Sequence, residues 1–273
     1  MNFHILTIFP DFIKEYFKAG IISKAIEKKL VDVFVYNLRD FSTDRRKSVD
    51  DRITGGGKGM LFKAPLLKAA VEEIKKSCRK AKVIFLSPQG KVFNNRLAKE
   101  LATFENLILI CGRYEGLDCR FVEKEVDIEI SVGDYVLTGG ELAALIVVDA
   151  VSRFAENALK RDAVNEESFE NNLLEYDHYT FPNEWEGMKI PDVLKSGNHR
   201  AISEYRFFNS LKKTYFNRID LLFLFFQERL KDLSSANEIK ALKKANKKFK
   251  DFLSNIQKIA KEWKYVRRDS EPE

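Results

Sequence analysis

The chain has 273 residues, 45% of them hydrophobic, and a formal net charge of +6. That length and apolar content suffice for one large domain or two smaller ones with a real core. No apolar run approaches the ~18 residues of a transmembrane helix, the N-terminus lacks the basic start of a signal peptide, and the three cysteines include no CxxC pair. The composition therefore predicts a cytoplasmic protein and gives no indication of a disulfide framework or a zinc site.

In the first part of the chain, segments with the apolar pattern of a strand alternate with a segment that has the pattern of a helix, as in an α/β protein. Residues 3–9 are a strand candidate, residues 12–30 have apolar positions at a period near 3.6, and residues 31–35 alternate as in a strand. Such a strand–helix–strand order predicts a parallel sheet. Residues 39–60 are dense in charge and predict a long polar loop, whose glycine-rich end matches neither a phosphate loop nor GxGxxG.

The next hundred residues continue this alternation. Helices are predicted at residues 65–80, 93–104 and 142–158, a helical turn at 122–126, and strands at 83–86, 107–111 and 128–130. Each of these strands is followed by a polar loop that contains glycine. Because the carboxyl ends of parallel strands meet at one edge of a sheet, the three loops are expected to converge on one crevice. For any one loop alone, a tight turn without a ligand is the alternative.

The last third of the chain has a different composition. Residues 160–172 are polar and predict a linker between a domain at 1–159 and a smaller one at 173–273, in which helices are expected. Positive charge is concentrated at residues 240–268, where eleven Lys or Arg accompany two acids. Such a basic tail indicates contact with a polyanion, or otherwise a solvated helix face.

Six motifs, in this order, resemble those of the bacterial tRNA (guanine-N1)-methyltransferases. They are Gly-Gly-Gly-Lys-Gly-Met at 55–60, Ser-Pro-Gln-Gly at 87–90, Cys-Gly-Arg-Tyr-Glu-Gly at 111–116, Gly-Asp-Tyr-Val-Leu-Thr-Gly-Gly-Glu at 133–141, His-Tyr-Thr at 178–180 and Ser-Gly-Asn-His at 196–199. The resemblance covers about residues 1–230 and does not extend to the basic tail. Six motifs in one order are specific, whereas one glycine loop is not.

The resemblance implies a SPOUT-class fold, in which a parallel α/β sheet has helices on both faces and a C-terminal trefoil knot. A smaller all-helical C-terminal domain is expected to follow it. The resemblance also implies a homodimer with active sites at its interface, S-adenosylmethionine as methyl donor, and tRNA as partner. The expected product is 1-methylguanosine at tRNA position 37, beside the anticodon.

By the same resemblance, the cofactor site is formed by three motif loops. The expected cofactor-binding residues are Leu86, Ser87, Pro88, Gln89, Gly112, Tyr114, Glu115, Val132, Gly133, Asp134, Tyr135, Val136, Leu137, Gly139 and Gly140. Glu115 is also the expected contact of a magnesium ion. The expected tRNA-binding residues are Asp50, Gly56, Gly57, Gly59, Met60, His178, Ser196, Asn198, His199 and Arg206.

The expected catalytic residues follow from the substrate chemistry and the resemblance together. N1 of neutral guanine carries a proton, so methyl transfer needs a base for that proton and a positive group near O6. The resemblance assigns the positive group to Arg153 and the base to Glu167, where the family has an aspartate before Ser-Phe. Asp177 stands where the family usually has proline and is a rival base; Phe181 stands where the family usually has arginine.

Methyl transfer to tRNA is the leading hypothesis, and two others are weighed against it. An RNA-binding protein of the same fold that has lost catalysis is the alternative, because Glu167 replaces the family's aspartate. A dinucleotide-dependent dehydrogenase is disfavoured because no GxGxxG follows the first strand.

Overall fold

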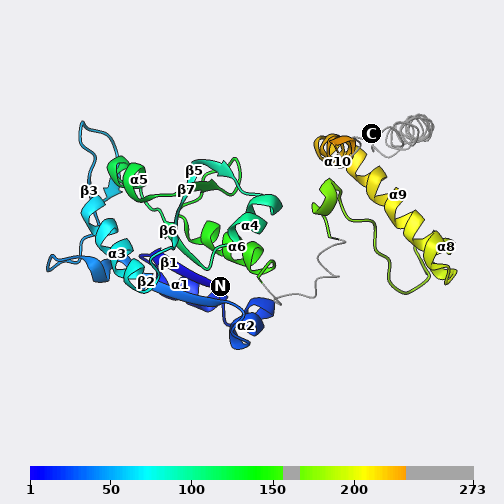
Figure 1. The fold of residues 1–273 in the computed structure, drawn as a ribbon, viewed down its shortest axis with the longest axis horizontal. Coiled ribbons are helices and arrows are strands. Elements are labelled where there is room, and N and C mark those ends of the chain that lie inside the picture. Colours follow the sequence, from blue (N-terminus) through cyan, green and yellow to red (C-terminus); the bar gives the residue numbers. More distant parts are fainter. Residues whose placement is uncertain (156–166, 232–273) are drawn as a thin grey trace. The chain divides into compact units, whose positions relative to one another are not determined.

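The computed structural model describes residues 1–155 and 167–231 and divides the chain into two compact units, Met1–Ala163 and Val164–Glu273 (Figure 1). Residues 160–166 of the predicted linker and the whole basic tail lie outside the described residues, so the predicted domain limits stay predictions. None of the described helices is long and apolar enough to cross a membrane.

The first unit is built on a five-stranded parallel sheet in the order β2-β1-β6-β5-β7. Its strands are β1 (Asn2–Thr7), β2 (Asp32–Asn37), β5 (Lys82–Val92), β6 (Asn106–Cys111) and β7 (Ile128–Ser131). β6 is buried and apolar over most of its length, as expected of a central parallel strand that is covered on both faces. The predicted α/β class with a parallel sheet is confirmed.

Helices cover both faces of this sheet, and each face has its own hydrophobic core. The helices are α1 (Pro10–Tyr16), α2 (Gly20–Glu27), α3 (Ala64–Ser77), α4 (Asn95–Leu101), α5 (Cys119–Glu125) and α6 (Glu141–Ser152). Side chains of α1, α2, α4 and α6 share one core with Phe3 and Ile5, and side chains of α3 and α5 share the other with Leu6 and Ile108. Because successive strand residues point to opposite faces, the sheet supplies both cores.

Four predicted helices are longer than the helices of the structure. α3 ends at Ser77 instead of residue 80, and α4 spans Asn95–Leu101 instead of residues 93–104. The expected helix at 12–30 is two helices, because Gly20 at the start of α2 has φ +79°, which a continuous helix does not contain. α6 ends at Ser152 instead of residue 158, and residues 156–158 lie outside the described part.

The charged segment that was expected to be a loop contains a short antiparallel hairpin. It consists of β3 (Asp50–Arg52) and β4 (Met60–Phe62), after the 3-10 helix η1 (Leu38–Phe41). β4 is also bonded to the loop after β6, where the N–H of Phe62 donates to the carbonyl of Gly116 at 3.0 Å. Backbone bonds of this kind explain a hairpin among polar side chains that show no strand pattern.

The motif at 87–90, the first of the three expected cofactor loops, is a bulge within a strand and not a loop after the strand end. β5 extends to Val92, and both Leu86 and Lys91 pair with Ile130 of β7, so the four residues between them bulge out of the ladder. A Cβ on Gly90 would lie 2.4 Å from the backbone of Glu129 and Ile130. Glycine therefore lets the end of the bulge press against β7.

The second unit contains short elements followed by helices. They are η2 (Glu170–Asn172), β8 (Glu184–Trp185), β9 (Met188–Lys189), α8 (Asp192–Lys195), α9 (His199–Asn217) and α10 (Ile219–Lys231). Leu173, Leu211, Leu222 and Phe225 form its described core. The described part is not all helical, because the turn at Glu186 and Gly187, both at positive φ, closes the β8–β9 hairpin.

Candidate active site

A crevice of about 550 Å³ lies where the β5 bulge meets the loops after β6 and β7. Of the expected cofactor-binding residues, these line it: Leu86, Ser87, Pro88, Gln89, Gly112, Tyr114, Glu115, Val132, Gly133, Tyr135, Val136, Leu137, Gly139 and Gly140. Asp134 does not line it. The three motif loops therefore converge on one crevice, as the order of strands and loops in the sequence predicts.

The walls of the crevice are loops in direct backbone contact. The N–H of Gly140 donates to the carbonyl of Gly112 at 2.8 Å. A Cβ on Gly140 would lie 2.7 Å from Cα of Cys111, so this contact requires glycine. The Tyr135 hydroxyl donates to the carbonyl of Val132 at 3.1 Å and folds the third loop onto itself.

The β3–β4 hairpin contacts Glu115, one of the residues that line the crevice. The N–H of Glu115 donates to the carbonyl of Met60 at 3.0 Å, and a Cβ on Gly59 would lie 2.4 Å from Cγ of Glu115. The structure thus brings two expected tRNA-binding residues beside an expected cofactor residue. Gly56 and Gly57 lie farther along, in the loop between β3 and β4, and Asp50 pairs with Phe62.

Arg113 and Thr138 also line the crevice, although the sequence did not predict them as cofactor-binding residues. Nε of Arg113 donates to Oε2 of Glu141 at 2.9 Å, and its Nη1 donates to the carbonyl of Thr138 at 3.0 Å. The available signal was an acid, Glu141, at the start of a helix that is otherwise apolar on most faces.

Arg153 lies at the opposite end of α6 from the crevice. It caps the carboxyl end of this 12-residue helix, so it is about 20 Å along the axis from Gly140. It lines a separate groove of about 520 Å³ with Tyr16, Ile21 and Asp149, among others. Within one chain, the structure does not bring Arg153 to the crevice.

The two candidate bases, Glu167 and Asp177, both belong to the second unit. Both carboxylate oxygens of Asp177 have partners: Nζ of Lys213 is 2.7 Å from Oδ1, and Nδ2 of Asn209 donates to Oδ2 at 3.2 Å. The hydrogen bond from Lys213 is the main reason that the pKa of Asp177 is lowered. Glu167 is half-buried and precedes a turn in which the N–H of Glu175 donates to Oγ of Ser168 at 3.0 Å.

The expected tRNA-binding residues of the second unit form two groups. Arg206 lies over the ring of Tyr176 at 4.7 Å, and His178 packs against the same ring at 4.8 Å between centroids. Near His199, the first residue of α9, two side chains shape the backbone: Asn198 caps the helix through the N–H of Ala201, and Oγ of Ser196 accepts from the N–H of Asn198. The side chains of Ser196 and Asn198 therefore stabilise the backbone at the start of α9.

Comparisons with known proteins place this architecture in one family. The family model described as tRNA (Guanine-1)-methyltransferase TrmD matches residues 1–223. Relatives named tRNA (guanine-N(1)-)-methyltransferase include one from Clostridioides difficile, 45% identical over 81% of this chain and 97% of the relative, and one from Dictyoglomus turgidum, 49% identical over 81% and 90%. One from Fervidobacterium nodosum is 46% identical over 85% of this chain and 99% of its own length. The chain belongs to the tRNA (guanine-1)-methyltransferase family.

Proposed function

We propose that this protein transfers a methyl group from S-adenosylmethionine to N1 of the guanosine at position 37 of tRNA. The observation that carries the proposal is the convergence of three motif loops on one crevice, in a chain whose relatives are named for methylation of guanine N1 in tRNA. These names do not favour the alternative of an RNA-binding protein without catalysis.

The residues of the crevice fit S-adenosylmethionine. Leu86, Val132 and Leu137 offer apolar contact for an adenine ring, glycine backbone offers hydrogen-bonding groups, and Glu115 offers a carboxylate for an ammonium group. When bound, S-adenosylmethionine supplies an electrophilic methyl group on a sulfonium sulfur. The crevice, whose walls are loops in direct backbone contact, would hold such a ligand in one orientation, which is the main requirement of a methyl transfer.

The protein's contribution to the chemistry is a base and a cation. Glu167 takes the proton from guanine N1, so that the N1 lone pair becomes available for the methyl group. Arg153 stabilises the negative charge that accumulates on O6. Asp177 is paired with Lys213, which lowers the pKa of the Asp177 carboxyl and makes it a weaker proton acceptor than an ordinary aspartate.

The position of Arg153 supports our proposal of a homodimer with shared active sites. The crevice and Arg153 are at opposite ends of α6, so one chain does not combine them. In a two-fold dimer, the same surface is used by both copies. If the two copies pack α6 against α6 in opposite directions, the Arg153 end of each meets the Leu142 end of the other, next to its crevice.

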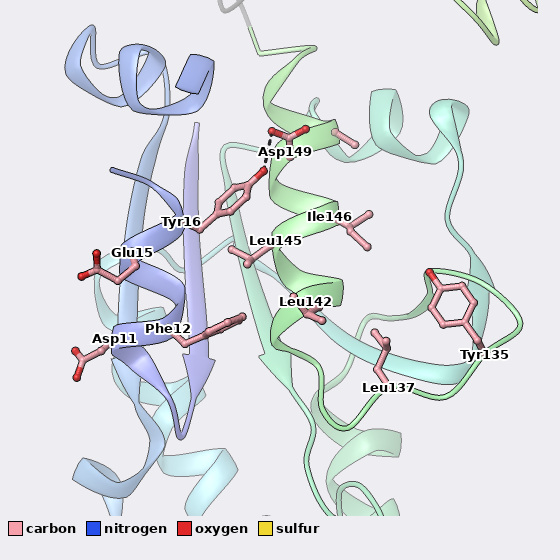
Figure 2. A pocket seen from close by; sticks show the side chains of 11 residues that line it. Asp11, Phe12, Glu15, Tyr16, Tyr135, Leu137, Leu142, Leu145, Ile146 and Asp149 are labelled. Carbon is pink, nitrogen blue, oxygen red and sulfur yellow. Dashed lines mark hydrogen bonds between the residues drawn. The ribbon is translucent and has the colours of Figure 1, made fainter. Parts of the chain in front are cut away.

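The exposed surface of α6 supports this packing. Its exposed residues form one stripe, with Leu142 at 50% and Ile146 at 44% exposure, followed by Asp149. The stripe ends at Arg153, which is half-buried. This stripe borders a groove of about 900 Å³ against α1, where Phe12 and Tyr16 face Leu145 and Tyr16 bonds to Asp149 (Figure 2). Apolar residues on both faces of a helix are typical of a helix buried on both faces. The occupant proposed for this face is a second copy of the chain.

We expect Ile146→Glu to convert the dimer to a monomer and to lower methyl transfer at least tenfold, because it places a charge in an apolar interface. Analytical ultracentrifugation measures the mass. Val92→Glu is the matched control, since Val92 is 55% exposed and lines neither groove; its dimer and activity should be unchanged. An intact dimer of the Ile146 variant would contradict the proposed interface.

For tRNA, we assign two contact surfaces. One is the β3–β4 loop beside the crevice, with Gly59 and Met60 nearest to Glu115. The other is the aromatic and basic group of Tyr176, His178 and Arg206, since aromatic rings and guanidinium planes stack on unpaired bases. Cytoplasmic location is expected for an enzyme that acts on tRNA.

The trefoil knot and the magnesium ion also belong to this proposal. The knot is proposed from the resemblance of the six motifs to those of the family. The described residues contain no group of three or more acids, histidines or cysteines that could hold a metal ion. A magnesium ion bound through Glu115 would therefore keep most of its waters.

The function is tested by incubating the full chain with tRNA transcript and labelled S-adenosylmethionine, followed by digestion and mass spectrometry. We expect label in 1-methylguanosine at position 37. A transcript with adenosine at position 37 is the control and should remain unlabelled. Label in another nucleoside, or no label, would contradict the proposal.

A further inference from the structure

A buried carboxylate lies directly behind the crevice. The side chain of Glu141 is only 2% exposed, yet it is an acid at the start of an apolar helix. Its Oε2 accepts from Nε of Arg113 at 2.9 Å, and its Oε1 accepts from Oγ1 of Thr7 at 2.8 Å. A buried charge is tolerated only where such partners satisfy it. Glu141 therefore joins three segments: the end of β1, the loop after β6 and the start of α6.

Arg113 extends this connection to the other wall of the crevice. Its Nη1 donates to the carbonyl of Thr138, and its side chain fills the space beside Gly139, where a Cβ would lie 2.1 Å from Nε. The guanidinium also lies over the ring of Phe9 at 4.6 Å. One side chain thus holds the loop at 112–116 against the loop at 133–140, and both loops line the crevice.

Stability alone does not explain a charged pair at this place. Replacing a buried ion pair by apolar residues of similar volume is often neutral or stabilising, because the charges lose their hydration. The pair instead fixes the positions of two loops. The bond of Arg113 to Glu141 holds the loop at 112–116 against α6, and the bond of Arg113 to Thr138 holds the loop at 133–140 against the loop at 112–116. We propose that Glu141, Arg113 and Thr7 are positioning residues that set the width of the cofactor crevice. The inference rests on the proposed function, since it assigns these residues to the S-adenosylmethionine site.

The sharpest test is at Thr7, because the change there is uncharged and keeps the shape of the side chain. Thr7→Val removes the hydroxyl that donates to Glu141 and that accepts from the N–H of Phe9. We expect the Kd and the KM for S-adenosylmethionine to rise about tenfold, with kcat within about twofold, because Thr7 and Glu141 do not line the crevice and act on it only through Arg113 and the loops. Thr7→Ser keeps the hydroxyl and should restore both values. Glu141→Gln should weaken binding more than Thr7→Val, because Arg113 loses its anionic partner.

The matched control is Thr214→Val in the second unit. Thr214 is fully buried and its hydroxyl is bonded to the backbone of Ser210 and Leu174, so its loss should lower the melting temperature without changing the Kd. Calorimetry with S-adenosylmethionine, steady-state kinetics and thermal melting are measured on the full chain. A Thr7→Val protein with lower melting temperature but wild-type Kd and KM would overturn the inference, even if Glu141→Gln fails to fold. A wild-type protein that binds no S-adenosylmethionine would contradict the proposed function as well.

Discussion

Glu167→Gln is expected to lower the single-turnover rate of methyl transfer by about 10² to 10³, the size of a typical general-base contribution. Glutamine keeps the length and shape of the side chain but does not accept the proton of guanine N1. Binding of tRNA and of S-adenosylmethionine should stay within about threefold of wild type, since the change removes only a proton acceptor. Single-turnover kinetics with excess enzyme measures the chemical step apart from product release.

Asp177→Asn is the matched control, because it makes the same change in the rival base. Lys213 and Asn209 already occupy the carboxylate of Asp177, so its role in the structure is to anchor the residues before the β8–β9 hairpin to α9. We expect this variant to lose some thermal stability and to keep its methyl-transfer rate within about threefold. Glu167→Asp, which restores the residue type expected from the family, should stay active. An unimpaired Glu167→Gln enzyme together with an inactive Asp177→Asn enzyme would move the base to Asp177.

The converging loops could be predicted from sequence because their signals are local. Glycines follow apolar strands at Leu86, Cys111 and Ile130, and parallel strands bring such segments to one edge. The bulge in β5 could not be predicted, since it depends on Leu86 and Lys91 pairing with the same residue of β7. That pairing is a tertiary contact between segments about forty residues apart.

The hairpin and the buried charge network were hidden for the same reason. Asp50–Arg52 has no apolar alternation, and it forms a strand because β4 is bonded both to it and to the loop after β6. Thr7 and Glu141 are 134 residues apart in sequence. Thr7 belongs to none of the six motifs, and Glu141 is only the last residue of the motif at 133–141. Sequence reasoning therefore located the crevice but not the residues behind it that hold its walls.

Where the bulge meets β7, the backbone itself sets the shape of the crevice, and a single methyl group tests this. A Cβ on Gly90 would lie 2.4 Å from the carbonyl carbon of Glu129 and from the nitrogen of Ile130, and 2.7 Å from the carbonyl oxygen of Glu129. These are backbone atoms in a paired strand, so no rotamer change can relieve the clash. The φ of Gly90 is not in the left-handed region, so the cost of alanine is steric alone.

Gly90→Ala is therefore expected to push the bulge away from β7 and to open the crevice along Ser87–Gln89. Overpacking of this kind costs up to about 3 kcal/mol, which corresponds to a fall of about 6 to 12 °C in melting temperature. The Kd for S-adenosylmethionine should rise at least 100-fold, because the wall formed by the bulge is displaced. Gly187→Ala is the control: Gly187 has φ +80° and open space around it, so alanine should cost only about 1 to 2 kcal/mol and leave the Kd unchanged. If Gly90→Ala melts and binds like the wild type, the close contact between the bulge and β7 does not shape the site.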